Sequence, residues 1–199
     1  MIFLDLVYQG SPQSVVQLMV RKNKSIPYLK ILDLVHAKDV KINLQTLINL
    51  ENQVLTNQQV FRAALTSAFV TKQEILIKIL KNEVQNILSE GEIKAAKTAA
   101  SLMAMNNLYY RFLHISEDKE YSQMPAGLRM RGILDHGIDK VSFEIFSLAA
   151  SIINGCAMFI DAHANQLVKQ SLSKSQVQMV AKIAAVVSSA AQVLVIEDL

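Results

Sequence analysis

The stretch FEIFSLAASIINGCAMFIDAHANQL, residues 143–167, decides the fold of this 199-residue chain. It consists of two apolar runs of helical length that flank the pair Asn154-Gly155. Asn-Gly between two periodic segments is a turn signal. The pattern therefore predicts two consecutive helices, over 140–153 and 156–170, joined by a tight turn.

The chemically interesting residues lie on both sides of this turn. Cys156 follows the turn directly, where the exposed N–H groups and the dipole of a helix N-terminus stabilise a thiolate. Helical spacing places Cys156, Phe159 and His163 on one face of the second helix. The first helix carries Glu144 at its start, and Ser147 follows one turn later.

If the two helices pack antiparallel, a carboxylate, a thiol and an imidazole can share a pocket. Such a trio would supply a base and a proton shuttle beside a sulfur nucleophile. The spacing is equally compatible with a plain helical core, because a lone cysteine on an apolar helix is commonly a small packing residue. In that case Glu144 is a solvated charge near a helix start, and His163 is a satisfied core residue or an exposed one.

The rest of the chain also predicts helices, so the expected fold class is all-α. The composition contains 3 Pro and 6 Gly in 199 residues, and we find no alternating strand pattern. Residues 114–138, which hold Pro125 and three glycines, form the expected connector between two halves. Besides the two helices above, the predicted helices cover 14–22, 27–35, 38–50, 57–70, 72–87, 90–113 and 174–196.

Local signals support several of these boundaries. A Ser or Thr followed three residues later by Glu or Gln forms a capping box, which satisfies two N–H groups at a helix start. The candidate pairs are Thr56 with Gln59, Thr71 with Glu74, Ser89 with Glu92, and Ser173 with Gln176. The helices over 90–113 and 174–196 are rich in alanine, which predicts that both lie centrally.

A weak internal repeat divides the chain into two similar helical halves. The pattern Ala-Lys-x-Ala-Ala at 96–100 recurs at 181–185, and Phe61 and Ala68 recur as Phe143 and Ala150. The repeat predicts two related halves, with the chemistry kept in the second.

Composition limits the classes of partner. The net charge is +3, from 20 basic and 17 acidic residues that are scattered along the chain, which argues against nucleic acid. A single cysteine fits a reducing compartment. The first 19 residues lack a basic start, so we expect no signal peptide, no membrane span and a cytoplasmic protein. The histidines show no ligand spacing, so no metal is expected.

Several blocks in order resemble the bacterial alkylhydroperoxidase D family, within the wider carboxymuconolactone decarboxylase-like superfamily. They are AKDVKINL (37–44), MAMNNLYYRF (103–112), AGLRMRG (126–132) and INGC (153–156). The family signature is Glu, eleven residues, Cys, two residues, Cys, three residues, His; here it reads Glu144, Cys156, Phe159, His163. The resemblance covers residues 29–199 as one domain, with the catalytic half near 139–199. Residues 1–28 form an extension of unknown role.

The resemblance implies an antioxidant oxidoreductase. Family members are all-α homotrimers that reduce organic hydroperoxides and recycle a partner peroxiredoxin. They bind no cofactor and take reducing equivalents from a lipoyl-bearing protein. By this likeness Glu144 is the relay carboxylate, Cys156 the first cysteine, with a proton-donor or resolving role, and His163 the relay histidine.

The chain departs from the family pattern at two positions. Phe159 stands where the second, attacking cysteine belongs, and Met158 stands where many members have a second histidine. A lone thiol cannot close an intramolecular disulfide. Cys156 could still form a mixed disulfide with a partner, or be oxidised to a sulfenic acid and rescued by an outside thiol. The alternatives are a non-catalytic interaction protein on the same scaffold and, by superfamily analogy only, a decarboxylase-like lyase.

Overall fold

The computed structural model describes residues 34–48 and 54–198. Within these residues the chain is helical and contains no strand, which confirms the all-α prediction. The α-helices are α2 (Lys38–Ile48), α3 (Asn57–Thr71), α4 (Glu74–Glu83), α5 (Glu90–Ile115), α6 (Lys140–Asn154), α7 (Ala157–Lys169) and α8 (Lys174–Ile196). The short 3-10 helices are η2 (Val35–Ala37), η4 (Val84–Asn86), η5 (Lys119–Gln123) and η6 (Arg131–Ile133). The predicted helix over 14–22, most of that over 27–35, and the extension 1–28 lie outside the described residues.

Three of the four predicted capping boxes are confirmed. They open α3, α5 and α8, and in each the Ser or Thr hydroxyl and the Gln or Glu side chain bond to one another's backbone N–H groups. The box predicted at Thr71 is wrong. Thr71 is the last residue of α3 and bonds to the Ala68 carbonyl, and Lys72 adopts a left-handed conformation. Gln73 caps α4 instead, because its side-chain oxygen accepts from two N–H groups of the first turn.

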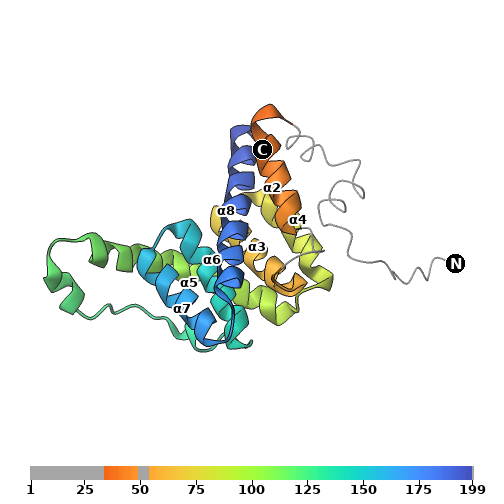
Figure 1. Ribbon diagram of the computed structural model, residues 1–199. Helices are drawn as coiled ribbons and strands as arrows, with labels where there is room; N and C mark the ends of the chain where they lie inside the picture. Colours follow the sequence, from red (N-terminus) through yellow and green to blue (C-terminus); the bar gives the residue numbers. More distant parts are fainter. Residues whose placement is uncertain (1–33, 49–53, 199) are drawn as a thin grey trace.

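Helix α6 is the centre of the bundle (Figure 1). It packs against α3, α5, α7 and α8. Nine of its residues are buried, and several of them are the large apolar side chains of the core. The alanine-rich helices α5 and α8 both pack on α6, as their small residues suggested, but the most enclosed helix is α6 itself.

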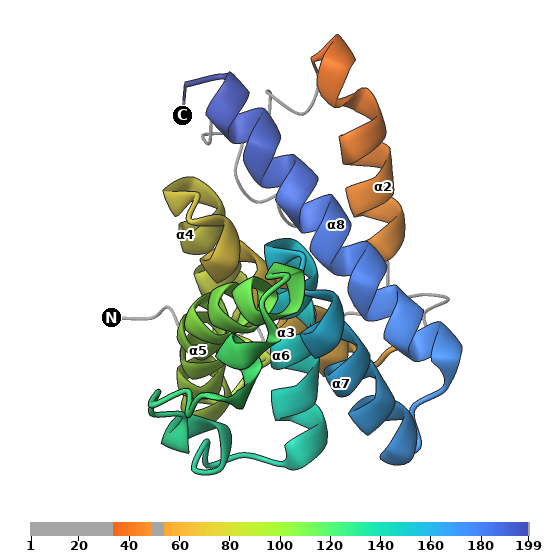
Figure 2. The same ribbon diagram turned by 90° about the vertical axis from the view of Figure 1, so that its left-hand side faces the viewer.

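Helix α8 crosses the bundle beside α2, and it also packs on α3 and α6 (Figure 2). Among the described residues it is the one helix that is long and apolar enough to cross a membrane by length and composition. Its apolar residues are partly used inside the domain: 44% of its most apolar window is buried. A core helix passes the same test of length and composition.

The far end of α5 and the segment after it project from the rest of the bundle, to the left in Figure 1. This segment contains η5 and η6 and corresponds to the predicted connector over 114–138. η6 returns along α5 so closely that a Cβ on Gly132 would lie 2.9 Å from Thr98 Cγ2 and 3.1 Å from Leu102 Cδ1. Glycine is required there for the contact between the connector and α5.

The order and bounds of the helices agree with the predicted repeat. α3 and α6 have 15 residues each, and each is followed by one residue with a positive φ. A shorter helix comes next, α4 or α7, and then a long helix that starts with a serine capping box, α5 or α8. The two halves pack through α3 and α6, which contact each other, while α8 lies on α3 and α5 lies on α6.

Candidate active site

The turn between α6 and α7 places the cysteine. Gly155 ends α6 with a φ of +66°, a conformation that glycine adopts without steric cost. The N–H of Cys156 then donates to the Ser151 carbonyl at 3.2 Å. Cys156 is the N-cap residue of α7, as the sequence predicted. Its side chain makes no capping hydrogen bond and is buried, with 2% of the residue exposed.

Glu144 and His163 form a buried pair across α6 and α7. Glu144 Oε2 lies 2.7 Å from His163 Nδ1, and the exposed fractions of the two side chains are 13% and 10%. An ionised carboxylate can only accept, so Nδ1 carries the proton and Nε2 is left as the acceptor when the ring is neutral. Nε2 is buried and has no hydrogen-bond partner in the described part of the chain.

Phe159 covers the imidazole. The rings of Phe159 and His163 have their centroids 5.7 Å apart, and the ring of Tyr110 on α5 meets Phe159 edge to face at 5.3 Å. Tyr109 stands edge to face against Tyr110 at 5.3 Å. A row of aromatic rings therefore extends from α5 to the imidazole, and the Phe159 ring supplies no polar atom to it.

The structure brings some of the predicted site residues together and leaves others apart. Glu144, His163 and Phe159 are in direct contact, as described above. Cys156 begins the same helix two turns before His163, a rise of about 10 Å along the axis. Met158 is 42% exposed on the outer side of α7. Cys156, Phe159 and His163 thus follow one another along α7, with Cys156 at its N-terminal end, and Glu144 reaches His163 from α6.

Arg111 is a residue whose role the sequence reasoning missed. In the structure its Nη1 donates to the Asn154 carbonyl at 2.7 Å, so α5 holds the last turn of α6 within the same chain. A Cβ on Gly155 would lie 3.8 Å from the same Nη1. The usable signal was that Arg111 belongs to the block MAMNNLYYRF, which also holds Tyr110, the residue whose ring meets Phe159.

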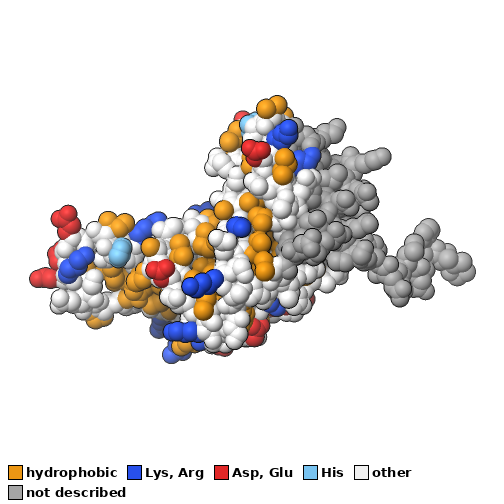
Figure 3. All heavy atoms as spheres, in the orientation of Figure 1, with side chains coloured by type: hydrophobic (Ala, Val, Ile, Leu, Met, Phe, Trp, Pro, Cys, Tyr) orange, Lys and Arg blue, Asp and Glu red, His pale blue; other side chains and the backbone are white. Residues whose placement is uncertain are grey.

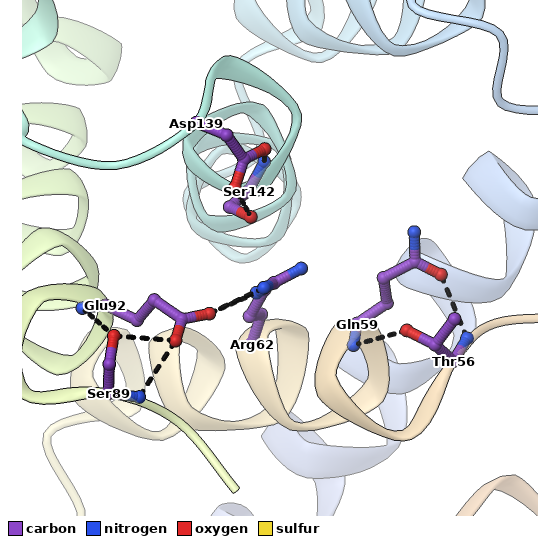
Figure 4. A network of polar contacts seen from close by, with 7 residues as sticks. All are labelled: Thr56, Gln59, Arg62, Ser89, Glu92, Asp139 and Ser142. Atoms are coloured by element: carbon purple, nitrogen blue, oxygen red, sulfur yellow. Dashed lines mark hydrogen bonds and ion pairs between the residues drawn. The ribbon is translucent and has the colours of Figure 1, made fainter.

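Polar contacts hold α3 against α5 and cap the start of α6 (Figure 4). Arg62 on α3 donates from Nε and Nη2 to Glu92 Oε1 at 2.8 and 2.6 Å. Burial disfavours the charged form of Glu92, but hydrogen bonds from Ser89 and from Arg62 outweigh it and hold the pKa of Glu92 below its ordinary value. Asp139 caps α6 through the Ser142 N–H and hydroxyl. Its burial is likewise outweighed, mainly by these bonds, so the pKa of Asp139 is lowered.

The first half of the repeat does not carry the same chemistry. Gln73 caps α4 at the place where Cys156 caps α7. Counting the offset of 82 between Phe61 and Phe143, Arg62 stands where α6 has Glu144. In the residues that the structure describes, the thiol and the carboxylate–imidazole pair belong to the second half.

The structure defines the chain as an all-helical bundle in which a carboxylate–imidazole pair joins α6 to α7 and a cysteine begins α7. Comparison with known proteins gives the family. The sequence profile of the carboxymuconolactone decarboxylase family matches residues 119–195, which hold η5, η6, α6, α7 and most of α8. The match includes all the signature residues.

Full-length relatives give the narrower family. The chain is 48% identical over 164 residues to the alkyl hydroperoxide reductase AhpD of Coxiella burnetii (strain RSA 493 / Nine Mile phase I), which covers 82% of this chain and 93% of that protein. It is 43% identical over 163 residues to the protein of the same name from Maricaulis maris (strain MCS10), with the same coverage of 82% and 93%. Over 173 residues it is 40% identical to that of Hyphomonas neptunium (strain ATCC 15444), covering 87% and 95%. The chain belongs to the alkylhydroperoxidase D family.

Proposed function

We propose that this protein is a cytoplasmic thiol oxidoreductase that reduces organic hydroperoxides or recycles a partner peroxiredoxin, and that Phe159 impairs it. The observation that carries the proposal is the buried Glu144–His163 pair, with its Nε2 directed away from Glu144 and with Phe159 against the ring. Cys156 and Phe159 precede His163 on α7 at helical spacing, and Glu144 holds the imidazole from α6.

The Glu144–His163 pair handles protons. The carboxylate orients the ring through Nδ1 and stabilises the imidazolium that forms when Nε2 accepts a proton. Nε2 can then return the proton to a leaving alkoxide. A thiol at position 159 would lie one helical turn before His163, which is the spacing at which side chains on a helix meet. Phe159 fills this position with a ring that can neither donate a proton to His163 nor form a sulfenic acid.

Cys156 is the only sulfur nucleophile that the sequence offers. Its thiolate would attack the peroxide oxygen, breaking the O–O bond and giving an alcohol and a sulfenic acid. One external thiol would condense with the sulfenic acid to a mixed disulfide and water. A second external thiol would then attack the mixed disulfide, which regenerates the Cys156 thiol and joins the two external sulfurs in a disulfide. Reduced lipoyl groups on a partner protein could supply both thiols, and no bound cofactor is needed.

The alternative is a non-catalytic interaction protein on the same scaffold. The observation in its favour is that Cys156 is 2% exposed and has no second cysteine to pair with. An unreactive Cys156 would fit this alternative. A useful measurement is the rate of Cys156 alkylation by iodoacetamide in the folded protein, compared with the same thiol in urea.

The decisive experiment is Phe159→Cys. With reduced lipoamide and an organic hydroperoxide, this variant is expected to consume peroxide at least about 10-fold faster than the starting protein, because the new thiol lies one helical turn from His163, which can take its proton, and can close a disulfide with Cys156. Phe159→Ser is the matched control, since it opens the same space without a thiol. Cys156→Ser in the Phe159→Cys background should lose the gain. If the folded Phe159→Cys protein is as inactive as the serine control, the proposal fails.

We also propose that the protein assembles as a homotrimer. Large apolar side chains are exposed on the projecting part of the molecule, where orange side chains gather in Figure 3. Leu108, Phe112 and Ile115 on α5 are 61%, 50% and 70% exposed, and Leu134 after η6 is 89% exposed. Contiguous apolar surface of this kind marks contacts between proteins. Light scattering coupled to gel filtration should give three times the chain mass of 22.1 kDa; a monomer would contradict the assembly.

A further inference from the structure

A groove of 540 Å³ lies between the end of α3, the outer face of α5 and the end of α6. Phe69 from α3 and Leu108 from α5 supply apolar wall. Lys72 and Lys97 also line the groove, and both residues are exposed. Among the residues that the structure describes, neither lysine has a carboxylate partner. The groove therefore presents two unneutralised ammonium groups beside apolar surface.

The segment that projects after α5 carries the opposite charge. We call residues 116–125 the arm; it includes η5 and lies at the far end of the projection, where acidic side chains gather in Figure 3. Its charged residues are three acids and one lysine. Glu117 and Glu120 are exposed and form no ion pair with a described residue. Tyr121 and Met124 add apolar surface, because they are 40% and 56% exposed.

The arm points away from the groove of its own chain. It follows Ile115, two turns beyond Leu108 on α5, and it extends away from α3, which forms one wall of the groove (Figure 1). The groove and the exposed apolar side chains of α5 are continuous, since Leu108 belongs to both and Phe112 follows one turn later. A second copy of the chain can therefore supply the arm that matches this groove.

We propose that the arm of one copy docks in the groove of a neighbouring copy. Its free carboxylates then face the two lysines, and its exposed apolar side chains lie against the apolar wall. Opposite charges on two surfaces select this pairing and fix its register. A contact between two different surfaces builds a ring when the rotation closes. The inference thus rests on the proposed homotrimer and names the surfaces that hold it together.

The docked arm also reaches the turn that carries the cysteine. Asn154 lines the groove and lies two residues before Cys156, whose side chain is buried. An arm packed against this turn opposes the local opening through which a reagent reaches the thiol. Dissociation of the copies should therefore speed alkylation of Cys156 by iodoacetamide at least about 3-fold. An equal rate in assembled and dissociated protein would overturn this part of the inference.

Reversing the charges tests the pairing, with the mass of the full-length protein measured by light scattering coupled to gel filtration. Lys72→Glu with Lys97→Glu reverses the groove, and Glu117→Lys with Glu120→Lys reverses the arm. Each pair of changes should raise the dissociation constant at least about 10-fold. All four changes together should restore assembly, because attraction replaces repulsion. Lys81→Glu with Lys94→Glu is the matched control, since it makes the same change of charge at exposed residues outside the groove.

The outcomes separate this inference from the proposed assembly. If the starting protein is a trimer and neither reversal weakens it, or if the four changes together do not recover it, the arm does not dock in the groove, although the homotrimer stands. A starting protein that is a monomer at every concentration would overturn both. Circular dichroism shows whether each variant keeps its helices. If a reversed variant unfolds, Lys72→Gln with Lys97→Gln replaces it and should weaken assembly at least about 3-fold; unchanged assembly would again overturn the docking.

Discussion

The ion pair between Arg62 and Glu92 allows a sharp test of what holds α3 against α5. Glu92 is the third residue of α5 and closes its capping box with Ser89, while its other oxygen accepts twice from Arg62. The capping boxes of α3 and α8 have Gln59 and Gln176 at the same place. The substitution Glu92→Gln should therefore keep the cap and remove only the charge that faces Arg62.

The magnitude follows from the burial and the geometry. Arg62 and Glu92 are 13% and 12% exposed, and two nitrogens converge on one oxygen within 2.8 Å. Hydrogen bonds to charged groups contribute about 1.5–3 kcal/mol, and two that share one acceptor are not additive. Leaving a buried guanidinium without its carboxylate can cost about 3–5 kcal/mol. We expect Glu92→Gln to lower the free energy of unfolding by about 2–4 kcal/mol near neutral pH.

The effect should depend on pH. The pKa of Glu92 in the folded protein lies below the ordinary value of 4.5. A carboxyl with a lowered folded pKa contributes stability that is complete above its unfolded pKa and is lost as the pH falls through its folded pKa. The difference between the starting protein and Glu92→Gln should therefore be largest above pH 4.5 and shrink as the pH falls below that value.

Urea unfolding followed by circular dichroism, near neutral pH and in acid, measures both quantities. Glu74→Gln is the control, because the Glu74–Lys78 pair is 83% and 73% exposed and should contribute little. Arg62→Met, alone and together with Glu92→Gln, completes a double-mutant cycle. A coupling energy below about 0.5 kcal/mol, or a stability difference that does not change with pH, would refute the reasoning.

Three further substitutions test the turn regions around η6 and between α6 and α7. Gly132→Ala should lower the free energy of unfolding by about 1–3 kcal/mol in urea unfolding, because the new methyl group would meet Thr98 at 2.9 Å. Equal stability would mean that η6 can move away from α5. Gly155→Ala should cost about 1–2 kcal/mol on the same measurement, because its φ is +66° while its Cβ position is open; a larger loss would indicate a clash instead. Arg111→Met should speed amide hydrogen exchange at the turn after Asn154, since the 2.7 Å bond to that carbonyl is lost, and unchanged exchange would show that the bond does not hold the turn.

Much of the fold could be predicted from the sequence because its signals are local. The boundary of α8 at 174–196 agrees with the prediction, and Cys156 starts α7 as the Asn-Gly turn indicated. The prediction failed at Thr71, where a capping-box pattern occurs by chance inside the last turn of α3. The side chain that caps α4 there is Gln73, which the rule for Ser and Thr overlooks.

The candidate site could be predicted in part. Residue spacing predicted that Glu144 and His163 could meet, and they do at 2.7 Å. Spacing within α6 and α7 could not show that Arg111 holds the turn, because its partner carbonyl lies 43 residues away on another helix. The same limit applies to Tyr110, which reaches Phe159 from α5.

The sequence by itself determined which segments are helical, where most of them begin, and which residues lie on the chemical side of α7, because periodicity, caps and turn residues act within a few positions of the chain. Only the tertiary structure decided that α6 is the most enclosed helix and that Phe159 covers the imidazole. Those features depend on how helices distant in sequence pack together. Packing is set by the shapes of all the side chains at once, and a pattern along one helix does not contain them.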